Sequence, residues 1–230
     1  MRILSIIFSV ALAMSVSAQT PLVQQAFDEG TQKAQAGNYE NAIENYRKAF
    51  ILSKSEKTND DFLARIHLNI GVCLYQLKRN GEAVEELTEA VKLSRRNYQK
   101  AFYALGMAHG AMKNWQAAET AFRAAVKLKK DDGEAWFDLA LVYLETKDFD
   151  AAEKAFHNAV KYKSVNYADA HNNLGVIYAL KNDFSAAEKE FKTALIESNG
   201  KSREAICNLQ FCKLYKQNFS RNLLAKLEFS

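Results

Sequence analysis

The sequence predicts an all-α protein built as a stack of similar helical hairpins. The first observation is a repeat, because small and apolar residues return every 34 or 35 residues, with one longer step of 41. The second is the apolar spacing inside each repeat, by three and four residues, which places those side chains on one helical face. The third is composition, since 230 residues with 9 Gly and 1 Pro suit a helical chain. A hairpin cannot bury its apolar face alone, so neighbouring copies must stack on it.

Four columns of residues define five copies of the hairpin. The first column holds the small residues Gly30, Gly71, Gly106, Ala140 and Gly175. Three further columns lie in the second helix: Ala42, Ala83, Ala118, Ala152 and Ala187; Tyr46, Leu87, Phe122, Phe156 and Phe191; Ala49, Ala90, Ala125, Ala159 and Ala194. We expect the small residues to let two antiparallel helices approach closely, while the large residues fill the space beside them.

This register resembles the tetratricopeptide repeat, whose period is about 34 residues. The resemblance extends from about Val23 to Asn199 and is weakest in the first helix of copy one. It implies a right-handed α-solenoid with five repeats, at about residues 23–56, 64–97, 99–132, 133–166 and 168–201. Residues 202–230 are then a degenerate sixth repeat that caps the stack. The family's closing proline is replaced by other residues in every copy: Lys54, Arg95, Lys130, Ser164 and Asn199.

Residues 1–18 have the pattern of a secretory signal peptide. Arg2 is followed by a short apolar run, and Val16-Ser17-Ala18 supplies small residues for cleavage before Gln19. An uncleaved anchor is the alternative, but the run is short for a membrane span. We therefore expect an exported protein, periplasmic or secreted, with no stable membrane span after cleavage.

The first repeat is expected to begin with Thr20 as N-cap and Pro21 as the first helical residue. Its helices should run to about Gln35 and from Tyr39 to Ser53. The polar stretch 54–61 holds the seven extra residues of the long step. Seven residues are nearly two helical turns, so either the flanking helices are longer or the stretch is a loop.

The turns inside the hairpins follow one pattern, in which an N-capping residue precedes an aromatic residue. The pairs are Asn38-Tyr39, Asn114-Trp115, Asp148-Phe149 and Asp183-Phe184. Copy two has Arg79-Asn80-Gly81 instead, and we expect this turn to be the loosest.

No motif in the chain indicates catalysis, and we predict no catalytic residue, metal ligand or cofactor. The histidines His67 and His171 stand in a large-aromatic column three copies apart, too far from each other to form one site. The three cysteines are best explained as small buried apolar residues. The net charge of +4 is evenly spread, which argues against a nucleic-acid partner, and we expect no small-molecule substrate.

The resemblance implies that first helices line a concave surface, through the fifth, sixth and ninth positions among others. We expect partner-binding residues there: Phe27, Leu68, Asn69, Tyr103, Met107, Phe137, Leu141, Asn172, Asn173 and Val176. The alternative is that fifth and ninth positions pack between neighbouring first helices. Family members that bind a chaperone's C-terminal carboxylate use five positions, of which only Asn69 and Lys100 match, so that activity is not expected.

The sequence therefore favours a non-enzymatic scaffold or adaptor of the cell envelope that binds a protein or peptide in the concave groove. One alternative is a periplasmic holdase for extended client segments. Another is an accessory subunit of an envelope enzyme complex. The apolar stripe is shared by these hypotheses, so it does not separate them.

Overall fold

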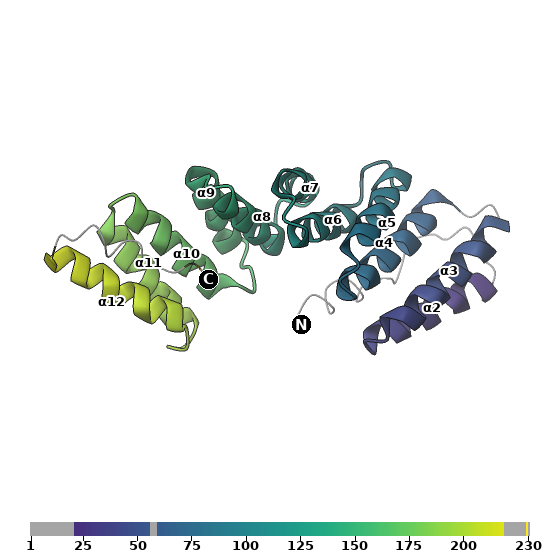
Figure 1. The fold of residues 1–230 in the computed structure, drawn as a ribbon, viewed down its shortest axis with the longest axis horizontal. Coiled ribbons are helices and arrows are strands. Elements are labelled where there is room, and N and C mark those ends of the chain that lie inside the picture. Colours follow the sequence, from purple (N-terminus) through teal and green to yellow (C-terminus); the bar gives the residue numbers. More distant parts are fainter. Residues whose placement is uncertain (1–20, 56–58, 219–228, 230) are drawn as a thin grey trace. The chain divides into compact units, whose positions relative to one another are not determined.

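The structure of the chain is a computed structural model that describes residues 21–55, 59–218 and 229. The predicted signal peptide, its cleavage point after Ala18, and the predicted N-cap Thr20 lie outside these residues. The regular structure of the described residues is entirely α-helical (Figure 1). The chain divides between Leu128 and Lys129 into two compact units, unit 1 and unit 2.

Each unit contains successive helices joined by short turns. Unit 1 holds α2 (Pro21–Gln35), α3 (Tyr39–Ser55), α4 (Asp60–Gln76), α5 (Asn80–Leu93), α6 (Gln99–Ala111) and α7 (Trp115–Leu128). Unit 2 holds α8 (Gly133–Glu145), α9 (Phe149–Lys161), α10 (Tyr167–Leu180), α11 (Phe184–Glu197) and α12 (Arg203–Asn218).

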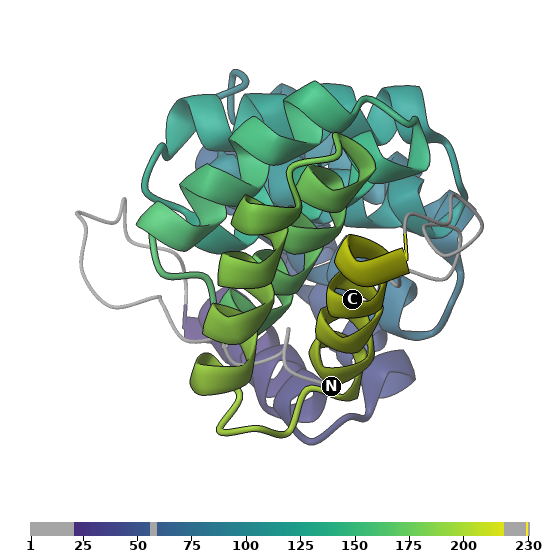
Figure 2. The ribbon, with the colours of Figure 1, turned by 90° about the vertical axis from the view of Figure 1, so that its left-hand side faces the viewer.

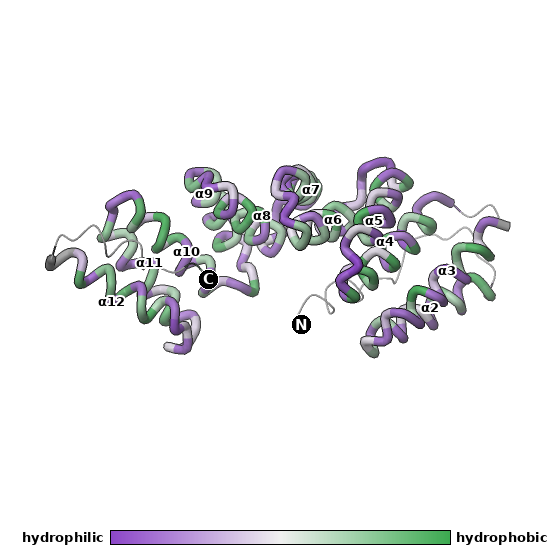
Figure 3. The backbone as a smooth tube through the Cα atoms, viewed as in Figure 1, coloured by the Kyte–Doolittle hydropathy of each residue, from purple (hydrophilic) through white to green (hydrophobic). Residues whose placement is uncertain are grey.

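Consecutive helices pack as hairpins, which confirms the predicted fold class. The pairs are α2 with α3, α4 with α5, α6 with α7, α8 with α9 and α10 with α11, and α12 packs on α10 and α11 (Figures 1 and 2). Hydrophilic and hydrophobic segments alternate along the helices (Figure 3), as expected when one face of each helix is buried.

The repeated columns form the core of the hairpins, as predicted. A Cβ placed on Gly106 would lie 2.7 Å from the ring of Phe122, and one on Gly175 would lie 2.5 Å from the ring of Phe191. The second-helix alanines are fully buried, Ala118 among them. The small residue of each first helix therefore leaves the space that the large residue of its second helix occupies.

Longer helices absorb the seven extra residues of the first repeat. Helix α3 has 17 residues where α7 has 14, and α4 has 17 where α6 has 13. Asn59 caps α4 by accepting a hydrogen bond from the Phe62 N–H at 2.9 Å. Of the two interpretations of residues 54–61, the structure favours longer flanking helices.

The turns inside the hairpins share one backbone geometry, including the turn of copy two. A left-handed residue precedes the second helix each time: Gly37, Lys78, Lys113, Lys147 and Asn182. The Arg79 N–H donates to the Leu74 carbonyl at 2.9 Å, as the Asn114 N–H does to the His109 carbonyl. Arg79, the N-cap of α5, forms no side-chain capping hydrogen bond, whereas Asp148 and Asp183 cap α9 and α11. That the turn of copy two is the loosest stays a prediction.

Candidate functional site

Seven of the ten residues predicted to bind a partner are buried, so the structure does not display them on a surface. They are Phe27, Leu68, Asn69, Phe137, Asn172, Asn173 and Val176. Tyr103, Met107 and Leu141 are half-buried. The alternative stated for the fifth and ninth positions, packing between neighbouring first helices, agrees with the burial of Phe27, Leu68, Phe137, Asn172 and Val176. Asn69 and Asn173 are sixth positions and lie outside that alternative. Whether any of the ten binds a partner stays a prediction.

Phe27 illustrates why an apolar fifth position becomes buried. Its ring lies 5.4 Å from the ring of Tyr46 and 5.2 Å from that of Phe62, measured between centroids. Tyr46 belongs to the same hairpin, whereas Phe62 belongs to the next one. Phe27 therefore joins two repeats, and aromatic pairs of this kind stabilise packing beyond the area they bury.

The buried asparagines of unit 2 bond to one another rather than facing solvent. Asn172 and Asn173 are 0% exposed. The Asn208 amide donates to the Asn172 side-chain oxygen at 2.9 Å, which links α12 to α10. A buried amide is costly without partners, so these contacts explain the asparagines as part of the packing between repeats.

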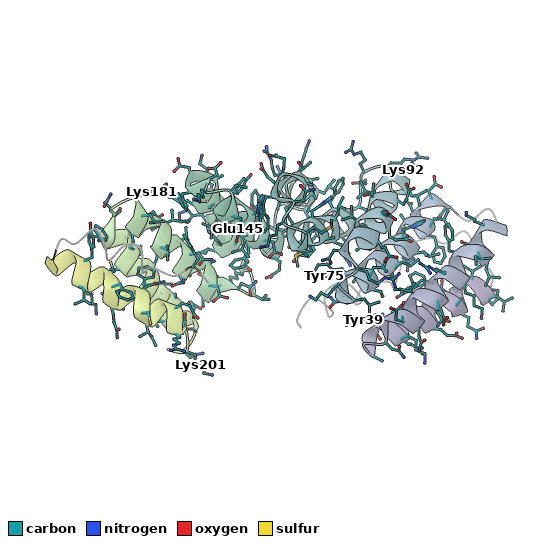
Figure 4. All side chains as sticks on the ribbon, viewed as in Figure 1. Tyr39, Tyr75, Lys92, Glu145, Lys181 and Lys201 are labelled. Carbon is teal, nitrogen blue, oxygen red and sulfur yellow. The ribbon has the colours of Figure 1, made fainter. Side chains whose placement is uncertain are left out.

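Half-buried basic and aromatic side chains, with one methionine, lie on two first helices of unit 1, and we call them the first-helix face. It consists of Arg65 and Tyr75 on α4 and Lys100, Tyr103 and Met107 on α6, all half-buried. The two helices are in contact. Figure 4 shows Tyr75 on a different side of unit 1 from Lys92, near the end of α5.

Arg65 is held in place on this face by aromatic rings. Its guanidinium lies 5.0 Å from the ring centroid of Phe27 and 5.6 Å from that of Phe62. Burial raises the pKa of the nearby Tyr98 phenol, and the positive charge of Arg65 opposes that shift. A guanidinium stacked on its face keeps its N–H edges for a carboxylate, so this position can bind an acidic group.

Acidic groups on the first helices of unit 2 take part in contacts between helices and turns. Glu134 accepts hydrogen bonds from Ser164 Oγ at 2.9 Å and from the backbone N–H of Val165. Burial raises the pKa of Asp169, and the charge of Glu204 adds to that effect. Glu134 thus fixes the turn before α10, whereas Asp169 and Glu204 form an acidic pair on α10 and α12.

A second polar feature, missed in the sequence, joins the two helices of a hairpin. His67 Nδ1 lies 2.6 Å from Glu86 Oε2, and His171 forms the same contact with Glu190. Both pairs are separated by 19 residues. Two histidines in one column, each with a glutamate at the same spacing, were the signal that could have revealed this contact.

The described residues contain no group of three or more His, Cys, Asp or Glu side chains placed to bind a metal ion. Cys73 and Cys212 are buried and Cys207 is half-buried, all as free thiols. Within the same residues, no helix combines the length and apolar character that crossing a bilayer requires.

Stacked hairpins with an accessible first-helix face define a helical-repeat scaffold for protein–protein interaction. Sequence models of the tetratricopeptide repeat family match residues 28–96, 103–160 and 147–202. The chain belongs to this family, whose members are generally not catalytic.

Two curated relatives share part of the chain. It is 33% identical over 91 residues to the mitochondrial import receptor subunit TOM70 of Rattus norvegicus, covering 40% of this chain and 14% of the relative. It is 26% identical over 106 residues to the DnaJ homolog subfamily C member 7 homolog of Schizosaccharomyces pombe, covering 46% of this chain and 21% of the relative. The chain thus matches at most about a fifth of either relative's length.

Solved structures share the fold over most of the chain. A MamA crystal structure is 25% identical, with a TM-score of 0.67, and covers 80% of this chain and 96% of that one. MamA from Desulfovibrio magneticus RS-1, from residue 41 to its end, is 20% identical, with a TM-score of 0.68 and coverages of 80% and 99%. YrrB, described as a repeat protein of this family with an unusual peptide-binding site, is 21% identical, with a TM-score of 0.62 and coverages of 84% and 90%.

Proposed function

We propose that this chain is a non-enzymatic scaffold or adaptor of the cell envelope, which binds a protein or peptide partner on the first-helix face of unit 1. The observation that carries the proposal is the placement of Arg65, stacked on Phe27 and Phe62, beside a neighbouring helix that presents Tyr103 and Met107. This face offers a fixed cation together with aromatic and thioether surface.

The chemistry of this face favours a peptide with a carboxylate next to an apolar side chain. The guanidinium of Arg65 can take a carboxylate in a charge-assisted pair. Tyr103 and Met107 supply the adaptable contact surface that is common in protein recognition. Lys100, on the first turn of α6, adds a second cation to the same face.

Site-specific photo-crosslinking tests this proposal in native cells. A crosslinker at Met107 should yield a discrete adduct, and one at the exposed Thr120 of α7 serves as the control. Arg65→Glu should remove the Met107 adduct without changing helicity. An adduct that survives Arg65→Glu, or that forms equally from Thr120, would place the partner elsewhere.

The envelope location rests on residues 1–18, with Arg2, the apolar run and the small residues up to Ala18. Fractionation followed by N-terminal sequencing tests it. A mature protein that begins at Gln19 in the exported fraction supports export, and a protein retained with Met1 in the cytosol contradicts it.

The burial of most apolar first-helix residues favours a defined partner over a periplasmic holdase. A holdase needs broad apolar surface, whereas Leu68, Phe137 and Val176 are buried. Suppression of client aggregation by the purified protein would reverse this preference. Co-purification with a cell-wall enzyme would instead identify the chain as an accessory subunit.

A further inference from the structure

The turn between α5 and α6 holds two consecutive arginines in the left-handed backbone region. Arg95 has a φ of 51° and Arg96 a φ of 62°. The Arg96 N–H donates to the Val91 carbonyl at 2.9 Å, and the Asn97 N–H to the Ser94 carbonyl at 3.0 Å. The turn is therefore well bonded, although left-handed geometry is unfavourable for residues that carry a Cβ.

The same turn recurs in the fifth repeat with the residues that suit it best. Asn199 and Gly200 stand at the positions of Arg95 and Arg96, with φ values of 51° and 73°. Asparagine and glycine tolerate this region at least cost. The backbone thus gives no reason for two arginines. Both are exposed, and among the described residues neither forms an ion pair.

Other cations gather at the same edge of unit 1. Because successive helices reverse direction, α3, α5 and α7 run the same way and end on one side. Their last turns carry Lys54, Lys92 and Lys127, where cations also complement the helix dipole. Figure 4 shows Lys92 projecting away from the body of the unit. We call these three lysines with Arg95 and Arg96 the arginine edge.

Acidic residues at this edge are fewer than the cations. They are Asp60 and Asp61 in the first turn of α4, and Glu89, whose Oε1 atom lies 3.4 Å from Lys92 Nζ. At the opposite edge, by contrast, Arg79 is paired with both Glu82 and Glu40. The arginine edge therefore presents net positive charge to its surroundings.

Exposed aliphatic side chains accompany the arginine edge. Ile51, near the end of α3, is 69% exposed, and Leu128, the last residue of α7, is 41% exposed. Cations mixed with isolated aliphatic groups suit the headgroup region of an anionic bilayer, where guanidinium groups bind phosphate and aliphatic tips enter the interface. A purely acidic polypeptide would give these aliphatic groups no partner.

We propose that the arginine edge docks unit 1 on an anionic phospholipid surface, with Arg95 and Arg96 contacting lipid phosphates. This surface consists of other residues than the first-helix face, although the two adjoin where Lys100 follows the arginine turn in the sequence. The docking is peripheral and electrostatic, so it weakens as salt rises.

The test is co-sedimentation of the full chain with vesicles. Wild type should bind phosphatidylcholine vesicles that contain phosphatidylglycerol, in a salt-sensitive manner, and should not bind phosphatidylcholine alone. Arg95→Asn with Arg96→Gly copies the turn of the fifth repeat. This variant should retain or raise the melting temperature while binding roughly 10- to 30-fold more weakly, as expected for the loss of two interfacial cations.

A matched control removes the same charge at the opposite edge. Lys78→Gly with Lys113→Gly also replaces two left-handed cations and should leave vesicle binding unchanged. Equal loss of vesicle binding in both variants would show that binding depends only on net charge, and it would overturn the proposal. So would an absence of vesicle binding by wild type, or capture of polyglutamate without capture of vesicles, which would identify an acidic polypeptide as the occupant.

Discussion

The Nδ1 atom of His171 lies 2.5 Å from the Oε2 atom of Glu190, so one polar contact joins the first helix of a hairpin to the second. The imidazole is mostly buried, and its Nε2 atom has no hydrogen-bond partner among the described residues. In repeats three and four, an aromatic ring and an alanine take the two positions: Phe102 with Ala121, and Trp136 with Ala155. The same two positions are thus filled in two ways, by a polar His–Glu pair or by an aromatic ring with an alanine.

These two solutions should be exchangeable as pairs but not singly. Glu190→Ala leaves the buried imidazole without its partner and should cost about 1–3 kcal/mol of unfolding free energy. Adding His171→Phe recreates the arrangement of repeat three and should recover most of that loss. Urea unfolding followed by circular dichroism measures both. A double variant as unstable as the single one would show that the pair is not a separable unit.

Two glycines should respond to alanine in opposite directions. A Cβ on Gly133 would lie 2.7 Å from the Ser164 backbone nitrogen and 2.9 Å from the Tyr162 carbonyl oxygen, whereas one on Gly110 would meet nothing within 4 Å. Gly133→Ala should therefore cost about 1–3 kcal/mol through overpacking. Gly110→Ala should gain about 0.5–1 kcal/mol from helix propensity. Equal effects in thermal melts would contradict this distinction.

The left-handed lysine of the α8–α9 turn is a site for stabilisation. Lys147 has a φ of 61°, and Gly37 stands at the same place in repeat one. Lys147→Gly should raise stability by about 1 kcal/mol, because glycine adopts this region without a Cβ penalty. Lys154→Gly, on an exposed position inside α9, is the control and should lower stability by about 1 kcal/mol. Differential scanning calorimetry distinguishes the two signs.

The contacts inside each hairpin could be predicted from the sequence, because they repeat. Gly106 opposite Phe122 is one instance of a column that recurs in five copies, so its packing role follows from the register. The lengths of α3 and α4 could not be predicted uniquely, because the seven extra residues between the first two repeats are compatible with either longer helices or a longer loop.

The candidate site was less predictable, because packing and partner binding impose the same residue types on a first helix. Phe137 was predicted to face a partner, yet it is 5% exposed and its ring lies 5.6 Å from that of Phe156. An apolar fifth position does not reveal which neighbour covers it. Arg65 was not singled out, since its significance comes from rings contributed by α2 and by its own helix.

Burial of the Cys73 thiol makes the free energy of unfolding depend on pH. Desolvation raises the pKa of this thiol from its ordinary value of 9.0 to about 12, so folding favours the protonated form. The stabilisation is fully present below pH 9 and is lost as the pH rises toward 12. The unfolding free energy should therefore fall between pH 9 and pH 12, and Cys73→Ala should flatten that part of the plot of stability against pH.

At pH 9, alkylation of the folded protein should modify the half-buried Cys207 and spare Cys73, as peptide mass mapping can show. Rapid modification of Cys73 in the folded state would contradict its assignment to a closed core.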